Sequence, residues 1–201
     1  MSKLKILAAS DIHGDSSLTK SLANRAQKEN VDLVILCGDL TGWSDSNNII
    51  KPFKSVNKPL LLIPGNWESV ETADLLASLY QVKNLHGTSS IYKEIGFFGA
   101  GGAEGPGPGR ISDSQILEAL KTAYQGVAGI EKKVMITHSH PAESKSEFSG
   151  IPGSQSITEA ISLFKPSLVL HGHIHEAAGF EEQIGQTRVI NVGRQGQIIE
   201  I

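Results

Sequence analysis

Polar side chains that could bind metal ions follow apolar runs at five places in this sequence. The clusters are Asp11-Ile12-His13, Asp39, Asn66, His138-Ser139-His140 and His173-Ile174-His175. Of the seven histidines, only His86 lies away from these clusters, since His171 is separated from the last one by Gly172 alone. Random placement would scatter the histidines along the chain, so their concentration indicates one shared site.

The residue types in these clusters indicate which ions the site could hold. Aspartate and asparagine offer oxygen and histidine offers imidazole nitrogen, whereas no cysteine lies in any of the clusters. Such a set suits borderline divalent ions such as Mn, Fe, Co, Ni or Zn better than Ca or Mg. A single histidine in this setting is more often a core or capping residue, so the inference depends on the five clusters together.

The candidate ligands are too numerous for one ion. They are Asp11, His13, Asp39, Asn66, His138, His173 and His175. Two ions that share Asp39 would use the whole set, because a carboxylate has two oxygens and Gly38 allows the backbone to approach closely. Two ions roughly 3.5–4 Å apart can hold a hydroxide between them and clamp a phosphoryl group for in-line attack.

The elements that must position these residues alternate between strand and helix in the first third of the chain. Strands are predicted over 4–9, 33–37 and 60–63, with helices over 16–30, 70–80 and, more weakly, 46–53. This order predicts parallel strands joined by crossover helices. Parallel strands place their carboxyl ends along one edge of a sheet, where ligands bind.

The middle of the chain departs from this alternation, which resumes after about residue 112. Short strands are predicted over 82–85, 90–95 and 97–100, and a Gly/Pro-rich loop follows over 99–110. The loop lacks the Gly-Lys-Ser/Thr ending of a phosphate-binding loop. We expect either a flexible surface loop or a loop that covers the substrate. The remaining predicted elements are helices over 112–127 and 156–165, strands over 134–137 and 168–170, and a terminal hairpin of 187–191 with 197–201.

Composition excludes several classes of protein. The 201 residues carry a net charge of -3 and no lysine- or arginine-rich block, which argues against nucleic-acid binding. Cys37 is the single cysteine, so we expect a buried thiol and a reducing, cytoplasmic location. Residues 1–10 resemble a signal peptide in their charge and apolar run, but the run is short and meets Asp11 at once, so we expect a strand there. No stretch approaches the ~20 apolar residues that a membrane span needs. With no linker or repeat in view, we expect a single domain over 1–201.

Taken in order, the five clusters resemble the motifs of the calcineurin-like metallophosphoesterase superfamily: Asp-x-His, Gly-Asp, Gly-Asn, a lone histidine after a strand, and Gly-His-x-His. The resemblance runs from Asp11 to His175 and implies a four-layer α/β/β/α sandwich of two mixed sheets flanked by helices. It implies that one ion is held by Asp11, His13, Asp39 and His175, and the other by Asp39, Asn66, His138 and His173. The short chain looks like the small single-domain phosphodiesterases rather than the nuclease members.

Two departures from the family pattern bear on specificity. Family members often follow Gly-Asn with a histidine that protonates the leaving oxygen, and here Trp67 takes that place. An indole donates one hydrogen bond but gives up no proton near neutral pH. Gly42 and Trp43 stand where protein phosphatases of the family carry an Asp-Arg pair, which argues against a phosphoserine/phosphothreonine protein phosphatase.

Several side chains near these motifs are candidate substrate contacts. Trp67 and Trp43 could form an apolar wall for a base or aryl group, or could close the edge of the core. Arg110 and Arg194 could contact phosphate, or could be solvated turn residues. Glu68 is read as a residue that starts a helix or supports a ligand, rather than as a ligand itself.

The leading hypothesis is a hydrolase that uses two divalent transition-metal ions, with Mn favoured, on a small phosphoester, preferably a diester. Asn66 and His140 are the candidate catalytic residues. Without a histidine in place of Trp67, the leaving oxygen takes a proton from water or from a nearby side chain such as His140, or departs unprotonated. Good leaving groups such as aryl esters should then be preferred.

A metal-poor scaffold that binds proteins through the same fold is the alternative, although the intact ligand set argues against it. A metal-dependent amidohydrolase usually carries its histidine pair on an early strand, whereas the pair here comes late.

Overall fold

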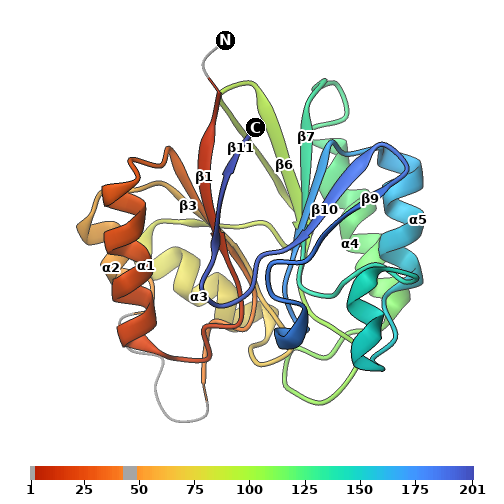
Figure 1. The fold of residues 1–201 in the computed structure, drawn as a ribbon, viewed down its shortest axis with the longest axis horizontal. Helices are drawn as coiled ribbons and strands as arrows, with labels where there is room; N and C mark the ends of the chain where they lie inside the picture. The colour runs from red at the N-terminus through yellow and green to blue at the C-terminus, as the bar shows by residue number, and fades with distance from the viewer. Residues whose placement is uncertain (1–2, 43–48) are drawn as a thin grey trace.

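The computed structural model describes residues 3–42 and 49–201, which form two mixed β-sheets packed face to face (Figure 1). The five-stranded sheet has the order β11-β1-β2-β3-β4 and the six-stranded sheet the order β5-β6-β7-β8-β10-β9. The first sheet comprises β1 (Lys5–Ala9), β2 (Leu33–Cys37), β3 (Leu60–Ile63), β4 (Lys83–Asn84) and β11 (Gln197–Glu200). The second comprises β5 (Ser89–Tyr92), β6 (Ile95–Ala100), β7 (Lys133–Thr137), β8 (Leu168–His171), β9 (Glu181–Ile184) and β10 (Thr187–Asn191).

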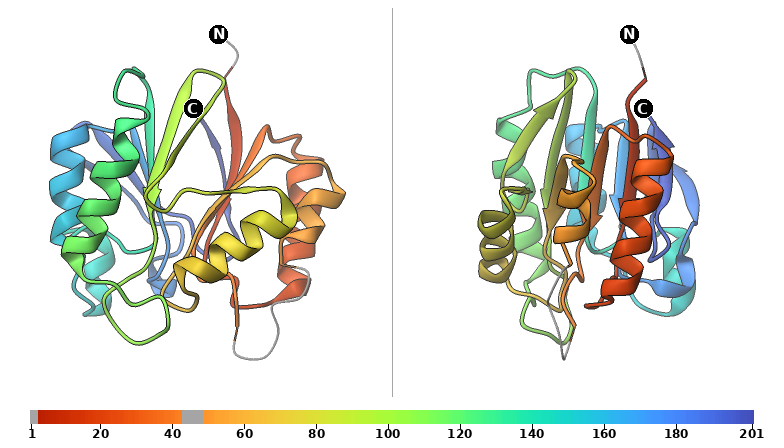
Figure 2. Two further views of the ribbon diagram at one scale, coloured as in Figure 1. Left: turned by 180° about the vertical axis from the view of Figure 1, so that it is seen from behind. Right: turned by 90° about the vertical axis from the view of Figure 1, so that its left-hand side faces the viewer.

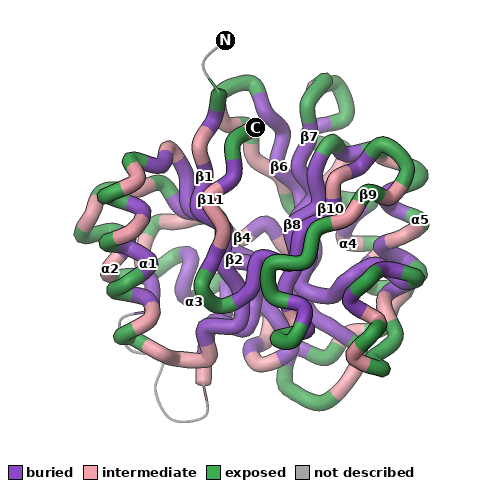
Figure 3. The backbone as a smooth tube through the Cα atoms, in the orientation of Figure 1, coloured by how far each residue is buried: buried purple, intermediate pink, exposed green. Residues whose placement is uncertain are grey.

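Helices cover the outer face of each sheet, which gives the expected four layers (Figure 2). α1 (Ser16–Lys28), α2 (Lys51–Ser55) and α3 (Val70–Tyr80) lie on the first sheet, and α4 (Asp113–Gln125) and α5 (Gln155–Phe164) lie on the second. Side chains alternate along each strand, so that Ile6 points into the core between the sheets and Leu7 packs under the helices. Strands covered on both faces are buried throughout, as the purple strands at the centre of Figure 3 show.

The register brings the ends of the central strands to one edge, which lies at the bottom of Figure 1. β1, β2 and β3 run parallel, with Ala9 beside Leu36 and Cys37 beside Ile63. β7 and β8 also run parallel in the second sheet. The loops that follow these five strands therefore leave the sheets side by side, as the sequence predicts. Cys37 is buried, as expected.

The predicted terminal hairpin is wrong. The two strands lie in different sheets, because β10 pairs with β8 and β9 while β11 pairs with β1. Instead, β10 forms a hairpin with β9, which lies at the edge of its sheet. The residues of β9, Glu181–Ile184, are too polar for a strand to be predicted from their sequence. The structure has the helix α2 (Lys51–Ser55) near the helix predicted over 46–53. Residues 46–48 of that prediction fall outside the described part of the chain.

Two short 3₁₀ helices complete the edge that carries the polar loops. They are η1 (Lys145–Ser149), which follows β7, and η2 (His175–Ala177), which follows β8. Among the described residues, no helix is long and apolar enough to cross a bilayer.

Candidate metal centre

Three of the five loops at this edge, those after β1, β2 and β8, hold polar residues in an unusual backbone conformation. Asp11, His13, Asp39 and His173 have φ angles of 58°, 49°, 52° and 69°, in the left-handed region. That region costs a residue other than glycine roughly 1–2 kcal/mol. Such strain persists only where the surrounding structure enforces it, and it gathers at functional sites.

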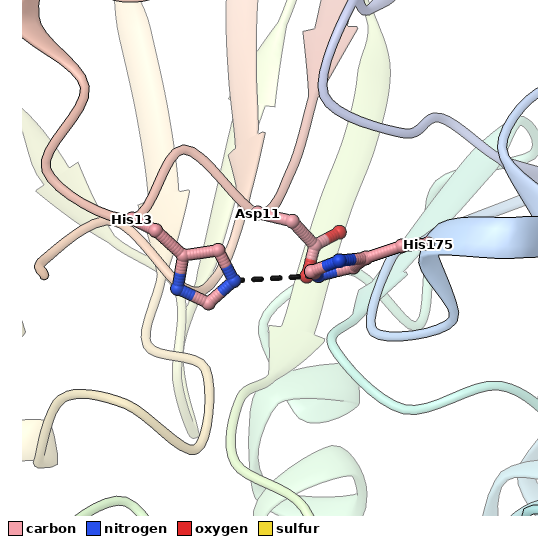
Figure 4. Close-up of side chains that lie close together, drawn as sticks. All are labelled: Asp11, His13 and His175. Carbon is pink, nitrogen blue, oxygen red and sulfur yellow. Dashed lines mark hydrogen bonds and ion pairs between the residues drawn. The ribbon is translucent and has the colours of Figure 1, made fainter.

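Three of the predicted ligands form a first cluster. The ligand atoms of Asp11, His13 and His175 all lie within 4.8 Å of one another, and the three side chains converge in Figure 4. The Nε2 atoms of His13 and His175 are 3.3 Å apart, and His175 Nε2 lies 3.5 Å from Asp11 Oδ1. The cluster joins the loop after β1 to η2 after β8, so it draws on both sheets.

A second cluster lies beside the first and is more deeply buried. The ligand atoms of Asp39, His138 and His173 also lie within 4.8 Å of one another. Asn66 joins this cluster, because its Oδ1 is 3.1 Å from His138 Nε2. The structure thus brings all seven predicted ligands to one edge.

Asp39 lies between the two clusters. Its Oδ1 is 3.3 Å from Nε2 of His138 in the second cluster, and its Oδ2 is 3.6 Å from Nε2 of His13 in the first. One oxygen therefore faces each cluster, as a carboxylate shared by two ions requires.

Backbone contacts orient the ligands. His138 Nδ1 donates to the Cys37 carbonyl at 2.8 Å, which turns Nε2 into the site. Asp39 Oδ1 accepts the Trp67 amide at 3.0 Å, and both Asp11 oxygens accept the His173 amide at 3.2 Å. A Cβ on Gly65 would come within 2.0 Å of Asp39 Oδ1, so only glycine allows this approach.

The aspartates and His173 are in the form that binds a cation, whereas His138 would have to release a proton first. Burial raises the pKa of Asp39, but the charge and hydrogen bond of His138 outweigh it and hold this pKa below its usual value. Burial lowers the pKa of His138, yet the Asp39 and Asp11 carboxylates raise it to about 9. Burial, with the His138 charge, lowers the pKa of His173 to about 4, which leaves its nitrogen lone pair free to bind. The donor set fits two divalent transition-metal ions.

The His140 ring is stacked on His173 of the second cluster, with a centroid distance of 6.4 Å, in an arrangement that does not suit a proton donor. Its Nε2 donates to the Ile151 carbonyl at 3.2 Å, while its buried Nδ1 has no hydrogen-bond partner among the described residues. Burial lowers the pKa of His140, so the ring is neutral near pH 7 and its one proton is already engaged. A catalytic role for His140 stays a prediction, and this geometry speaks against it.

Of the predicted substrate contacts that the structure describes, Trp67 has its ring against a candidate metal ligand. Trp67 is half-buried, with its ring edge-to-face on His13 at a centroid distance of 5.9 Å. Arg110 is exposed at the end of the Gly/Pro-rich loop, and Arg194 pairs with Asp15 at 3.3 Å. Trp43 lies outside the described residues.

The Gly/Pro-rich loop itself packs against the second cluster. The Asn66 side-chain amide donates to the Pro106 carbonyl at 3.1 Å, and the Gly109 amide donates to the Asn66 carbonyl at 3.0 Å. These bonds fix the Asn66 amide with its oxygen toward His138.

Two further residues shape the site: Glu68, for which support of a ligand was one of the two roles expected from the sequence, and Asn191, for which no role was expected from the sequence. Glu68 does not start α3, which Ser69 caps, but accepts hydrogen bonds from two of the site's loops. Asn191 at the end of β10 donates to the carbonyls of Gly172 and Ile174 and so anchors the Gly-His-x-His loop. A polar residue at the end of an apolar strand was the signal for the ligands, and Asn191 carries the same signal.

Comparison with known proteins identifies the class that this fold and site define. The calcineurin-like phosphoesterase superfamily domain matches residues 4–199, and the chain belongs to this family. No curated protein matches the chain.

Solved structures share the fold at low sequence identity. The chain is similar to the protein TT1561 of Thermus thermophilus, with 20% identity, a TM-score of 0.78, and coverage of 96% of this chain and 91% of that one. A structure described as a novel archaeal phosphodiesterase is 20% identical with a TM-score of 0.57, covering 98% and 99%. A dimetal phosphatase from Danio rerio is 12% identical with a TM-score of 0.62, covering 94% and 87%.

Proposed function

We propose that the protein hydrolyses phosphodiesters with the help of two divalent transition-metal ions, Mn²⁺ being the favoured metal. The first ion would be held by Asp11, His13, Asp39 and His175, and the second by Asp39, Asn66, His138 and His173. The observation that carries the proposal is the position of Asp39, with one oxygen toward each cluster. Ions bound there would activate water and neutralise charge on the phosphate.

The protein's own side chains would bind and orient the substrate. The amide of Asn66 is fixed by the Gly/Pro-rich loop beside the second cluster. The ring of Trp67 stands beside His13 and offers an apolar wall to one ester group of the substrate. An aryl or nucleoside group would pack against such a wall.

The lack of a proton donor beside the clusters, among the residues that the structure describes, supports a preference for good leaving groups. Trp67 cannot give up a proton near neutral pH, and His140 already donates to the Ile151 carbonyl. The leaving oxygen would then depart unprotonated or take a proton from water. Both routes favour aryl esters over alkyl esters.

The proposal includes the setting of the reaction. We take residues 1–201 as one domain, because all three hydrophobic clusters belong to the same pair of sheets. The lone buried thiol of Cys37 suits a reducing compartment such as the cytoplasm.

A substrate panel tests this function. Metal-free protein would be reconstituted with Mn²⁺ and assayed on aryl monoesters, linear aryl diesters and cyclic nucleotides at equal concentration. We expect the linear aryl diester to give the largest kcat/KM. A larger value for the monoester would overturn the diester assignment while leaving the metal centre intact.

A further inference from the structure

Glu68 holds together two of the loops that carry metal ligands. Its side chain is only 1% exposed, and both of its oxygens are engaged. Oε2 accepts the amides of Leu40 and Thr41, each at 2.9 Å, and the Thr41 hydroxyl at 3.1 Å. Oε1 accepts the amide of Gly65 at 2.6 Å.

These donors belong to the loops of Asp39 and Asn66. Leu40 and Thr41 directly follow Asp39, whereas Gly65 directly precedes Asn66. Asp39 has a left-handed φ of 52°, so the turn that it begins needs support from its neighbours. One carboxylate thus fixes the spacing between the ligand shared by both ions and a ligand of the second ion.

The chemistry of the four contacts requires a carboxylate of this length. All four partners are hydrogen donors, and a carboxylate has acceptors at both ends. A glutamine has one acceptor oxygen, so its NH₂ group would face either the Gly65 amide or the three donors of Leu40 and Thr41. An aspartate is one methylene shorter and could not reach both loops.

We propose that Glu68 is a positioning residue that sets the affinity of the protein for its second metal ion. The inference rests on the proposed two-ion function. Glu68 contacts the loops of Asp39 and Asn66, while Asp11, His13 and His175 of the first cluster lie on loops after β1 and β8. Its loss should therefore weaken the second ion more than the first.

Calorimetric titration of Mn²⁺ into the metal-free full-length chain tests the proposal. We expect Glu68→Gln to bind the second ion about 10–100-fold more weakly than the wild type, the usual cost of losing a group that orients metal ligands. The first ion should lose less. Thr41→Val removes one of the four contacts to Glu68, together with the hydroxyl's 3.3 Å contact to the Trp67 carbonyl, so its second ion should weaken by a smaller factor.

Two controls separate positioning from simple destabilisation. Glu71→Gln changes an exposed carboxylate in the first turn of α3 and should leave both ions as in the wild type. In amide NMR spectra of the metal-free protein, Glu68→Gln should move the Leu40, Thr41 and Gly65 signals, which Glu71→Gln should leave in place.

Three outcomes decide the matter. A Glu68→Gln variant that melts earlier but binds both ions as tightly as the wild type would show that the residue only stabilises the fold. If Glu68→Gln does not fold, an unchanged second affinity in Thr41→Val overturns the proposal. A wild-type protein that takes up no metal overturns the two-ion function itself, and the role of Glu68 with it.

Discussion

Trp67 is the residue where this chain departs most from the resemblance that its motifs show. Its ring packs edge-to-face on His13, and its backbone amide donates to Asp39. The backbone thus supports the site, while the side chain is the part that can change without loss of the Asp39 contact. Substrate preference is therefore best tested at this side chain.

Trp67→His should raise the turnover of alkyl phosphodiesters more than that of aryl phosphodiesters. An imidazole can protonate a poor leaving oxygen, and such general acid catalysis is worth about 10²–10⁴-fold where it is needed. The measurement is kcat for matched alkyl and aryl diesters. Trp67→Phe keeps an apolar ring without the proton and serves as the control. An equal response of the two leaving-group classes to Trp67→His would refute this account.

His138 should make the stability of the metal-free protein depend on pH. Its pKa is raised in the fold to about 9, above the unfolded value near 6.5, so the protonated form is stabilised. This contribution, about 3 kcal/mol, is fully present below pH 6.5 and is lost as the pH rises through 9. Urea unfolding in chelator between pH 7 and 10 should show the decline. The same slope in His138→Gln would contradict the assignment.

The candidate ligands could be picked out from the sequence because each lies within four residues after the end of a strand. The direction of the strand decides at which edge of the sheet such a residue lies. The sequence left two roles open for Glu68 and assigned none to Asn191, because both bond to backbone groups whose positions depend on the turn geometry. His140 shares the strand-end signal with His138, yet its ring turns to the Ile151 carbonyl. Position after a strand therefore selects candidates, and side-chain direction separates them.

At the scale of elements, the loop between β3 and α3 is packed against the loop after β2 with no space to spare. A Cβ on Gly65 would lie 2.0 Å from Asp39 Oδ1 and 2.3 Å from the Asp39 amide nitrogen. A Cβ on Gly129, in contrast, would meet no described residue within 4 Å apart from its own chain neighbours. The two glycines therefore offer a matched pair of positions for substitution.

Gly65→Ala should displace Asp39, weaken metal binding and lower the free energy of unfolding by about 1–3 kcal/mol, the usual cost of overpacking. Gly129→Ala is the matched control and should change the free energy of unfolding by less than about 0.5 kcal/mol. Chemical denaturation and Mn²⁺ titration measure both effects. If the two variants behave alike, the contact between the loops does not constrain the site.

The alternation of strand and helix in the first third of the chain could be predicted from the sequence, because apolar runs and helical spacing are patterns of neighbouring residues. The pairing of the last strands could not be predicted in the same way, because β11 pairs with β1 at the other end of the chain, while β10 pairs with β8 and β9. The polar edge strand β9 left no apolar pattern from which to predict the hairpin that it forms with β10.

At the scale of the whole molecule, the site joins the two sheets. Asp11, His13, Asp39 and Asn66 follow strands of the first sheet, and His138, His173 and His175 follow strands of the second. Ions bound here would link the sheets at the edge where their loops meet.

Metal should therefore raise the melting temperature. At a free Mn²⁺ concentration 100 times its Kd, one site adds about 2.7 kcal/mol, which corresponds to a rise of roughly 5–10 °C in a chain of this size. Differential scanning calorimetry with Mn²⁺ or with chelator measures the shift. An Asp39→Asn variant should lose most of it, because that residue faces both clusters. A full shift in Asp39→Asn would indicate that the metal binds elsewhere.

Two ions that act together on a phosphodiester at Asp39 are the centre of the proposed function. The most direct test is hydrolysis of an aryl phosphodiester by the metal-free protein as Mn²⁺ is added in known amounts per chain. We predict that activity rises to a plateau at two ions per chain and is lost in Asp39→Asn. No metal uptake and no turnover would contradict the two-ion function, and would favour a protein-binding scaffold on the same fold.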